Sequence, residues 1–222
     1  MTTKTLTLSL AIAAAFATTL GAAAPILAQA QAPAASAAKQ QTPSQLVLNN
    51  SQRVLTALEK RRPEFRKDRG ALQAFIKSEF DAMFDREYAA RLVLGRHGRG
   101  ASAEDVKLFS DALADNLMDR YGSSLLDFNT QLRVRVKSET ALERGLGVRV
   151  SSEFLRQGGE PIPVDYLMRR SGQGWKVFDV MVEGVSYVQT FRKQFDAELQ
   201  RKSIRQVATE LRGGRLQAGT AQ

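Results

Sequence analysis

The chain has 222 residues, of which 43% are hydrophobic and 25% are charged, so its composition is that of a globular protein of one or at most two domains. Its formal net charge of +9 predicts attraction to anionic surfaces without distinguishing phospholipid, nucleic acid and acidic protein. The sequence has no cysteine and a single histidine, His97, which excludes disulfides, thiol nucleophiles, cysteine-linked lipid anchors and histidine-rich zinc sites.

Residues 1–30 are typical of a secretory signal peptide. Lys4 is the only charged residue before Lys39, and an apolar run after it ends in small residues, with Ala-Gln-Ala at 28–30. This order predicts cleavage near Ala30. An uncleaved membrane anchor is the alternative, because the uncharged stretch is long enough to span a bilayer. A cleaved chain without a cysteine to acylate is expected in the periplasm of a Gram-negative bacterium.

An Ala/Gln-rich leader at 31–41 lacks apolar periodicity and is expected to be flexible. Thr42 then caps a helix whose apolar stripe runs from Leu46 to Leu58, and Pro63 is expected to stop this helix. The folded domain is predicted to begin at this cap.

Three more helical segments follow before the pattern changes. The first begins near Asp68, and its apolar face consists of Leu72, Phe75, Ile76, Phe80, Met83 and Phe84. The second covers 87–94 and ends at Gly95. Ser102 caps the third, which is long and has Asp105 in its first turn. Large apolar side chains therefore line one face of this half of the chain.

After the long helix the apolar period changes from about 3.6 residues to two. The alternating segments predict strands at 132–137, 147–154, 162–168 and 175–182. A loop with two glycines joins the last two strands as a hairpin. Helices followed by such a meander predict an α+β fold, in which helices pack on one face of a curved antiparallel sheet of about four strands.

Two helices are predicted after the sheet. Gly184 allows a left-handed turn, and Ser186 caps a helix with a large apolar side. A short helix follows at 203–211, and 213–222 is expected to be a flexible tail. These elements place a single folded domain at 42–212.

Few residues suggest catalysis. Asp179 and Glu183 lie four residues apart at a strand end and could form an acid/base pair, although charges in this position more often cap a helix or face solvent. His97 lies in a loop of Gly and Arg, where a solvated histidine is the simpler interpretation. The Gly-rich segment 95–100 lacks the Lys-Ser/Thr ending of a phosphate loop.

The densest charge cluster is 60–69, with six basic residues against Glu64 and Asp68. Binding of nucleic acid would require aromatic side chains among these charges, and only Phe65 is present. The segment is therefore either a solvated turn between helices or a docking site for an acidic partner or anionic headgroups. No nucleic-acid partner is predicted.

The apolar faces of the predicted helices and of the last strand are expected to converge on one space. Ordinary core packing explains each stripe taken separately, whereas a ligand cavity would explain why so much bulky apolar surface meets so small a sheet.

Two motifs carry a resemblance to a known family. The first, within 161–195, comprises Trp175, Asp179, Glu183, Gly184, Val185 and Ser186. The second runs from Ala90 to Gly95 and continues with Ala101, Ser102 and Phe109. In this order, over 42–212, the chain resembles the MlaC family of periplasmic phospholipid-binding proteins, also called the toluene-tolerance family. The loop 96–99 departs from the pattern, because relatives often carry an aromatic residue there.

The resemblance implies an NTF2-like or cystatin-like fold that encloses acyl chains, and a monomeric periplasmic carrier rather than an enzyme. Such a carrier shuttles phospholipid between an outer-membrane lipoprotein-porin complex and an inner-membrane ABC transporter with an MCE-domain subunit, and so maintains outer-membrane lipid asymmetry. Phospholipid is its cargo; no cofactor or metal is implied. The alternatives are an NTF2-like lyase or isomerase that uses Asp179 or His97, and a non-lipid periplasmic adaptor with a solid interior.

For a carrier, the expected lipid-binding residues are Phe80, Met83, Phe84, Val180, Val182, Val185, Val188 and Phe191. Val185 ranks first, because it lies between strand and helix in the matched motif. Two acyl chains have about 30 methylenes, so exposing them to water would cost on the order of 20 kcal/mol. Transfer is therefore expected only in contact with a partner that offers a continuous apolar path.

Overall fold

The computed structural model describes residues 41–126 and 132–219. Nearly all of the predicted signal peptide and leader therefore lies outside the described residues. Every described residue belongs to one compact unit, which begins at residue 40. Within the described ranges, none of the helices has the length and apolar character needed to cross a membrane.

The first two helices follow directly from their local sequence. Helix α1 spans Pro43–Lys60, and Thr42 closes its start with the predicted capping box. Helix α2 spans Arg62–Lys67 and has Pro63 in its first turn. The expectation that Pro63 only ends a helix was therefore incomplete, because proline in a first turn has no N–H that the helix needs.

Two of the next three helices begin where the sequence predicts, near Asp68 and at Ser102, whereas the cap at Asp85 was not predicted. Helix α3 spans Arg69–Met83, α4 spans Arg86–Leu94, and α5 spans Ala103–Tyr121. Asp68, Asp85 and Ser102 accept a hydrogen bond from a first-turn N–H of these three helices, respectively. Short 3-10 turns follow α4 at Gly95–Gly98 and α5 at Ser123–Leu126.

The sheet is antiparallel throughout and its strands follow one another in chain order. They are β1 Arg133–Ala141, β2 Val148–Leu155, β3 Ile162–Ser171, β4 Gly174–Val182 and β5 Val185–Ser186, with a 3-10 turn at Glu143–Gly145 after β1. The two-residue β5 adds a fifth strand to the four that were expected. Its turn contains Glu183 and Gly184, whose φ angles are 51° and 82°.

A register shift in β4 changes which residues face inward. Leu167 pairs with Asp179, but its neighbour Met168 pairs with Val177, so Phe178 is the extra residue of a bulge. Val177 before the bulge and Val180 after it consequently belong to the same apolar cluster. Strict alternation of inward and outward residues would place Val177 and Val180 on opposite faces of the sheet.

Helix α6 spans Tyr187–Leu199 and α7 spans Ile204–Arg212. The segment after α7 was expected to be a flexible tail. Residues 213–219, the described part of it, are instead held by hydrogen bonds. Buried Asn116 donates to the carbonyls of Leu211 and Leu216 and accepts from the N–H of Ala218, which is fully buried. These hydrogen bonds hold residues 213–219 against α5.

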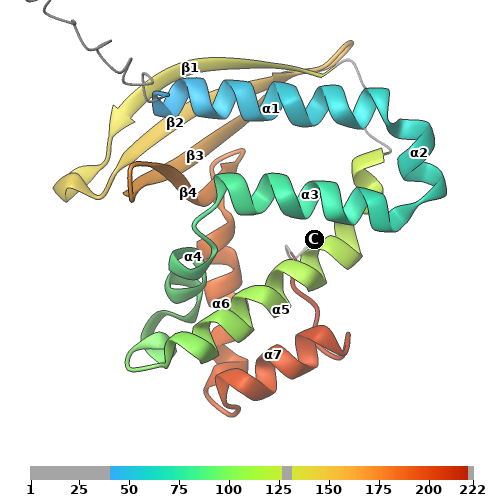
Figure 1. The fold of residues 1–222 in the computed structure, drawn as a ribbon. Coiled ribbons are helices and arrows are strands. Elements are labelled where there is room, and N and C mark those ends of the chain that lie inside the picture. Colours follow the sequence, from blue (N-terminus) through green and yellow to red (C-terminus); the bar gives the residue numbers. More distant parts are fainter. Residues whose placement is uncertain (1–40, 127–131, 220–222) are drawn as a thin grey trace, which may run out of the picture. The chain divides into compact units, whose positions relative to one another are not determined.

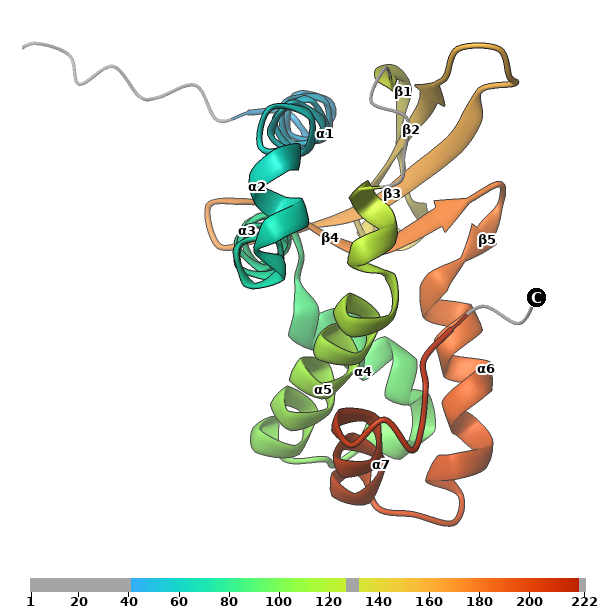
Figure 2. The ribbon, with the colours of Figure 1, turned by 90° about the vertical axis from the view of Figure 1, so that its right-hand side faces the viewer.

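The described elements form an α+β arrangement, as predicted. Helix α1 lies along the sheet over β1 and β2, and α5 lies between α3 and α7 (Figure 1). Seen from the side, α4, α5, α6 and α7 form a helical layer beyond β4 (Figure 2). One apolar cluster fills that helical layer, and a second lies between α1 and the sheet. The boundary between these two clusters is where the site is found.

Candidate functional site

A cavity of about 380 Å³ lies between the end of α3, α4, α5, β4 and α6. Six of the eight predicted lipid-binding residues line it, namely Phe80, Phe84, Val180, Val182, Val188 and Phe191. Its volume lies in the range of small-molecule sites, and its wall is mainly apolar. The structure therefore brings together residues from three separate segments of the sequence.

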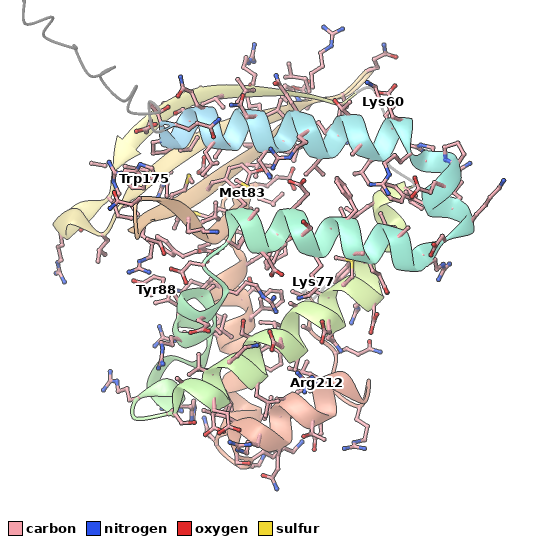
Figure 3. The ribbon with its side chains drawn as sticks, viewed as in Figure 1. Lys60, Lys77, Met83, Tyr88, Trp175 and Arg212 are labelled. Carbon is pink, nitrogen blue, oxygen red and sulfur yellow. The ribbon has the colours of Figure 1, made fainter. Side chains whose placement is uncertain are left out.

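Met83 and Val185, the other two residues of the predicted set, do not line this cavity. Met83 is 3% exposed and packs with Val47 and Val150 beneath the sheet (Figure 3). Helix α3 ends at Met83, so the helical spacing that grouped it with Phe84 does not continue. Val185 follows the turn into the short edge strand, where its side chain is 53% exposed.

The sequence pattern did not assign several lining residues to the site. Leu113, Ala114 and Leu117 of α5 were not among the predicted lipid-binding residues, yet all three line the cavity. Their spacing of one, three and four positions places them on one helix face. Phe178, the bulged residue of β4, completes the wall and meets Tyr88 edge-to-face at 5.4 Å between ring centroids.

The corner between α3 and α4 is hydrogen-bonded to β4. Two aromatic rings that line the cavity lie beside this corner. Lys176 donates to the last carbonyls of α3, at 3.0 Å from that of Asp81 and 2.5 Å from that of Ala82. The N–H of Asp85 bonds the carbonyl of Val177 at 2.8 Å. Beside this corner, the rings of Phe80 and Phe84 stack with centroids 4.0 Å apart. The wall is therefore held in place by hydrogen bonds to main-chain groups.

Asp179 is a buried carboxylate at the edge of the cavity. Its Oδ2 accepts a hydrogen bond from the Ser186 hydroxyl at 2.6 Å, and its Oδ1 accepts from the N–H of Val188 at 3.0 Å. Burial raises the pKa of Asp179, against the opposing effect of these hydrogen bonds. Glu183 is exposed in its turn, so the two carboxylates do not form the acid/base pair considered above. Asp179 instead fastens the start of α6 to β4.

His97 lies outside the cavity and has a structural partner. Its Nε2 is 3.0 Å from Oδ1 of Asp196 on α6, and Arg96 pairs with the other oxygen of the same carboxylate. The hydrogen bond from His97 is the main cause that lowers the pKa of Asp196. These contacts connect the turn after α4 to α6, which is a simpler role than catalysis.

A second cavity, of about 640 Å³, adjoins the first between α3 and α5. The two share Phe80, Arg86, Ala114 and Leu117 in their walls. The second cavity is more polar, since Lys77 of α3 and Arg212 of α7 also line it; Figure 3 labels both side chains. A ligand with an apolar part and a polar part would therefore find both environments side by side.

Arg86 stands at the junction of the two cavities. Its guanidinium pairs with Asp81 at 2.6 Å and with Asp111 at 2.8 Å, and its side chain is 15% exposed. Both terminal nitrogens are thus engaged with carboxylates, which hold the guanidinium in place at the junction. In the part of the chain that the structure describes, no three His, Asp or Glu side chains are grouped closely enough to hold a metal ion.

Comparisons with known proteins agree on one family. The family model described as MlaC protein matches residues 48–213. The toluene tolerance protein ttg2D of Pseudomonas putida is 25% identical over 164 residues, which cover 72% of this chain and 74% of that protein. The intermembrane phospholipid transport system binding protein MlaC of Haemophilus influenzae is 20% identical over 179 residues, or 79% and 83% of the two chains.

The fold also matches a solved structure. A phospholipid-binding protein from Ralstonia solanacearum, in complex with a phospholipid, superposes with a TM-score of 0.68 at 22% sequence identity. The match covers 78% of this chain and 98% of that one. Together with the family model, which spans most of the chain, this leads to one conclusion: the protein belongs to the MlaC family.

Proposed function

We propose that this protein is a periplasmic phospholipid carrier whose cargo places its acyl chains in the apolar cavity between β4, α5 and α6. The observation that carries the proposal is the pair of adjoining cavities, one apolar and one bordered by charged groups. Well-packed interiors have few voids larger than a water molecule, so cavities of this size favour a ligand.

The energetics favour a carrier that exchanges its cargo by contact. About 30 methylenes of two acyl chains gain on the order of 20 kcal/mol by leaving water, so spontaneous release into water is very slow. Transfer is reversible if the acyl chains have a similar free energy in the cavity and in the bilayer interior. Docking on a membrane complex then has to open an apolar path between the cavity and the complex.

We further propose that the partners are an outer-membrane lipoprotein-porin complex and an inner-membrane ABC transporter with an MCE-domain subunit, between which a monomeric carrier maintains outer-membrane lipid asymmetry. Membership of the MlaC family supports this assignment, as does the name of the Haemophilus influenzae relative, which is a binding protein of an intermembrane phospholipid transport system. The predicted signal peptide supports a periplasmic location.

The enzyme alternative is less well supported. It needs a free acid or base in a closed cavity, whereas both oxygens of Asp179 are occupied by groups at the start of α6. His97 does not line either cavity. The adaptor alternative needs a solid interior, and the two cavities count against it.

Lipid extraction from the purified protein tests the proposal. We expect mass spectrometry to find co-purifying phospholipid in about equimolar amount, and protein stripped of lipid to regain it from phospholipid vesicles. A folded preparation that holds no lipid and takes none from vesicles would refute the proposed function.

A further inference from the structure

A third cavity, of about 320 Å³, lies at the other end of α3, where α2 meets α3 and the end of α5. Arg66 and Arg69 line it together with apolar side chains such as Phe65 and Leu72. It shares Gln73, Met118, Asp119 and Gly122 with the 640 Å³ cavity. Three hollows thus adjoin one another along α3, from the apolar end at Phe80 to a cationic end at Arg69.

The length of this series fits a lipid. Arg69 is the first residue of α3 and Phe80 lies eleven residues later, which corresponds to about 17 Å along the helix axis. The hydrocarbon core of a bilayer is about 30 Å thick, so the acyl chains of one leaflet occupy about half of that. A headgroup at Arg69 would therefore allow acyl chains to reach the cavity beside Phe80.

The basic side chains at the cationic end have no ion-pair partner among the described residues. The side chains of Lys60, Arg66, Lys67 and Arg69 are exposed, and no hydrogen bond or ion pair connects these side chains to other described residues. The two acidic residues of the segment are already engaged. Glu64 pairs with Arg61 at 2.7 Å, and Asp68 accepts from an N–H in the first turn of α3.

Only two of the four free cations, Arg66 and Arg69, line the cavity. Both carry a guanidinium group, which matches phosphate oxygens with two parallel hydrogen bonds, whereas Lys60 and Lys67 carry point charges and lie outside the lining. One carboxylate, that of Asp119, is also present and accepts from the Gln73 amide at 3.3 Å. It makes the site less favourable for a doubly charged phosphate ion than for a singly charged diester.

We propose that Arg66 and Arg69 bind the phosphodiester of the cargo lipid, with its acyl chains directed along α3 toward Phe80. The inference rests on the proposed carrier function and adds the position and the recognition of the headgroup. It also gives the basic segment 60–69 a role beyond general surface charge.

A competition between two lipids with the same acyl chains tests this assignment. Lipid-free protein is incubated with phosphatidylcholine vesicles that contain dioleoylglycerol, which lacks the phosphate, and the bound lipids are quantified by mass spectrometry. The variant Arg66→Gln/Arg69→Gln is compared with Lys60→Gln/Lys67→Gln, which removes the same charge from the same segment but leaves the cavity lining intact.

We expect the wild-type protein and the lysine variant to prefer phosphatidylcholine, and the arginine variant to lose this preference by about tenfold or more. An unchanged preference in the arginine variant would overturn the inference. Equal losses of loading in both variants would overturn it too, since they would indicate general attraction to the membrane surface. Wild-type protein that takes up neither lipid would instead refute the carrier function itself.

Inorganic phosphate separates a lipid headgroup from a free ion. The side-chain NMR signals of Arg66 and Arg69 are followed while phosphate alone is titrated, and then while the lipid is loaded. We expect lipid to shift these signals at concentrations at which phosphate does not. Saturation by phosphate alone, with no response to lipid, would contradict the assignment.

Discussion

Replacing Val180 with glutamate is expected to abolish lipid loading while the fold is retained. Val180 lines the apolar cavity, where an ionised carboxylate would have to lose its water to admit acyl chains. A penalty of about 3 kcal/mol lowers the affinity roughly a hundredfold. The measurement is the amount of phospholipid bound after incubation with vesicles, with circular dichroism to verify the fold.

Val185 offers the matched control for this experiment. Val185→Glu makes the same substitution five residues further along the chain, at a side chain that is 53% exposed and outside the cavity lining. We expect it to load lipid like the wild-type protein. Loss of loading in this variant, with normal loading in Val180→Glu, would show that the acyl chains bind elsewhere.

Replacing Asp179 with alanine is expected to cost about 2–4 kcal/mol of unfolding free energy, measured by urea denaturation. The substitution leaves the Ser186 hydroxyl and the N–H of Val188 without their acceptor at the start of α6. Asp179→Asn keeps one oxygen to accept from the N–H of Val188, and its amide N–H can donate to the Ser186 hydroxyl instead, so it should recover most of the loss. Equal destabilisation by alanine and asparagine would show that the hydrogen bonds are not the cause.

The protonation of the Asp179 carboxyl makes the free energy of unfolding depend on pH. Because burial raises its pKa, the folded protein keeps this proton to a higher pH than the unfolded chain, whose carboxyl titrates near about 3.9. The stability from this group is complete below that value and is lost as pH rises through the raised pKa. Relative to Asp179→Asn, wild type should therefore be more stable in acid than at pH 7. A stability difference that does not change with pH would contradict the raised pKa.

Local signals predicted most elements of the fold. Thr42, Ser102 and Ser186 begin the expected helices, because a cap and the next apolar residues act within one or two turns. The strands were recognised for a similar reason, since alternation is a local property. The turn at Gly184 was also expected, although its pairing into a fifth strand was not.

The features that the sequence did not predict depend on contacts between distant segments. The bulge at Phe178 changes the inward face of β4 without any mark in the local pattern. The docking of Ala218 depends on Asn116, about a hundred residues earlier. Val185 was ranked first because it lies in a family motif, yet its exposure depends on the edge position of β5.

The cavity is the clearest example of a feature that the sequence does not predict. Phe80, Leu117 and Phe191 have the spacing of ordinary core residues on their own helices, and packed or unpacked interiors produce the same periodicity. Whether three apolar faces fill the space between them depends on distances across the domain. A sequence pattern can therefore identify residues that could line a cavity, but it cannot show whether the space between them is empty or filled by side chains.

The most direct test of the central claim is to locate the acyl chains by photo-crosslinking. The purified protein is loaded with a phosphatidylcholine that carries a photoreactive group near the end of one acyl chain, irradiated, digested and mapped by mass spectrometry. We expect crosslinks on residues of the 380 Å³ cavity, such as Leu117 and Val180. Crosslinks confined to surface positions such as Val185, or to none of the cavity residues, would contradict the claim that this cavity holds the lipid.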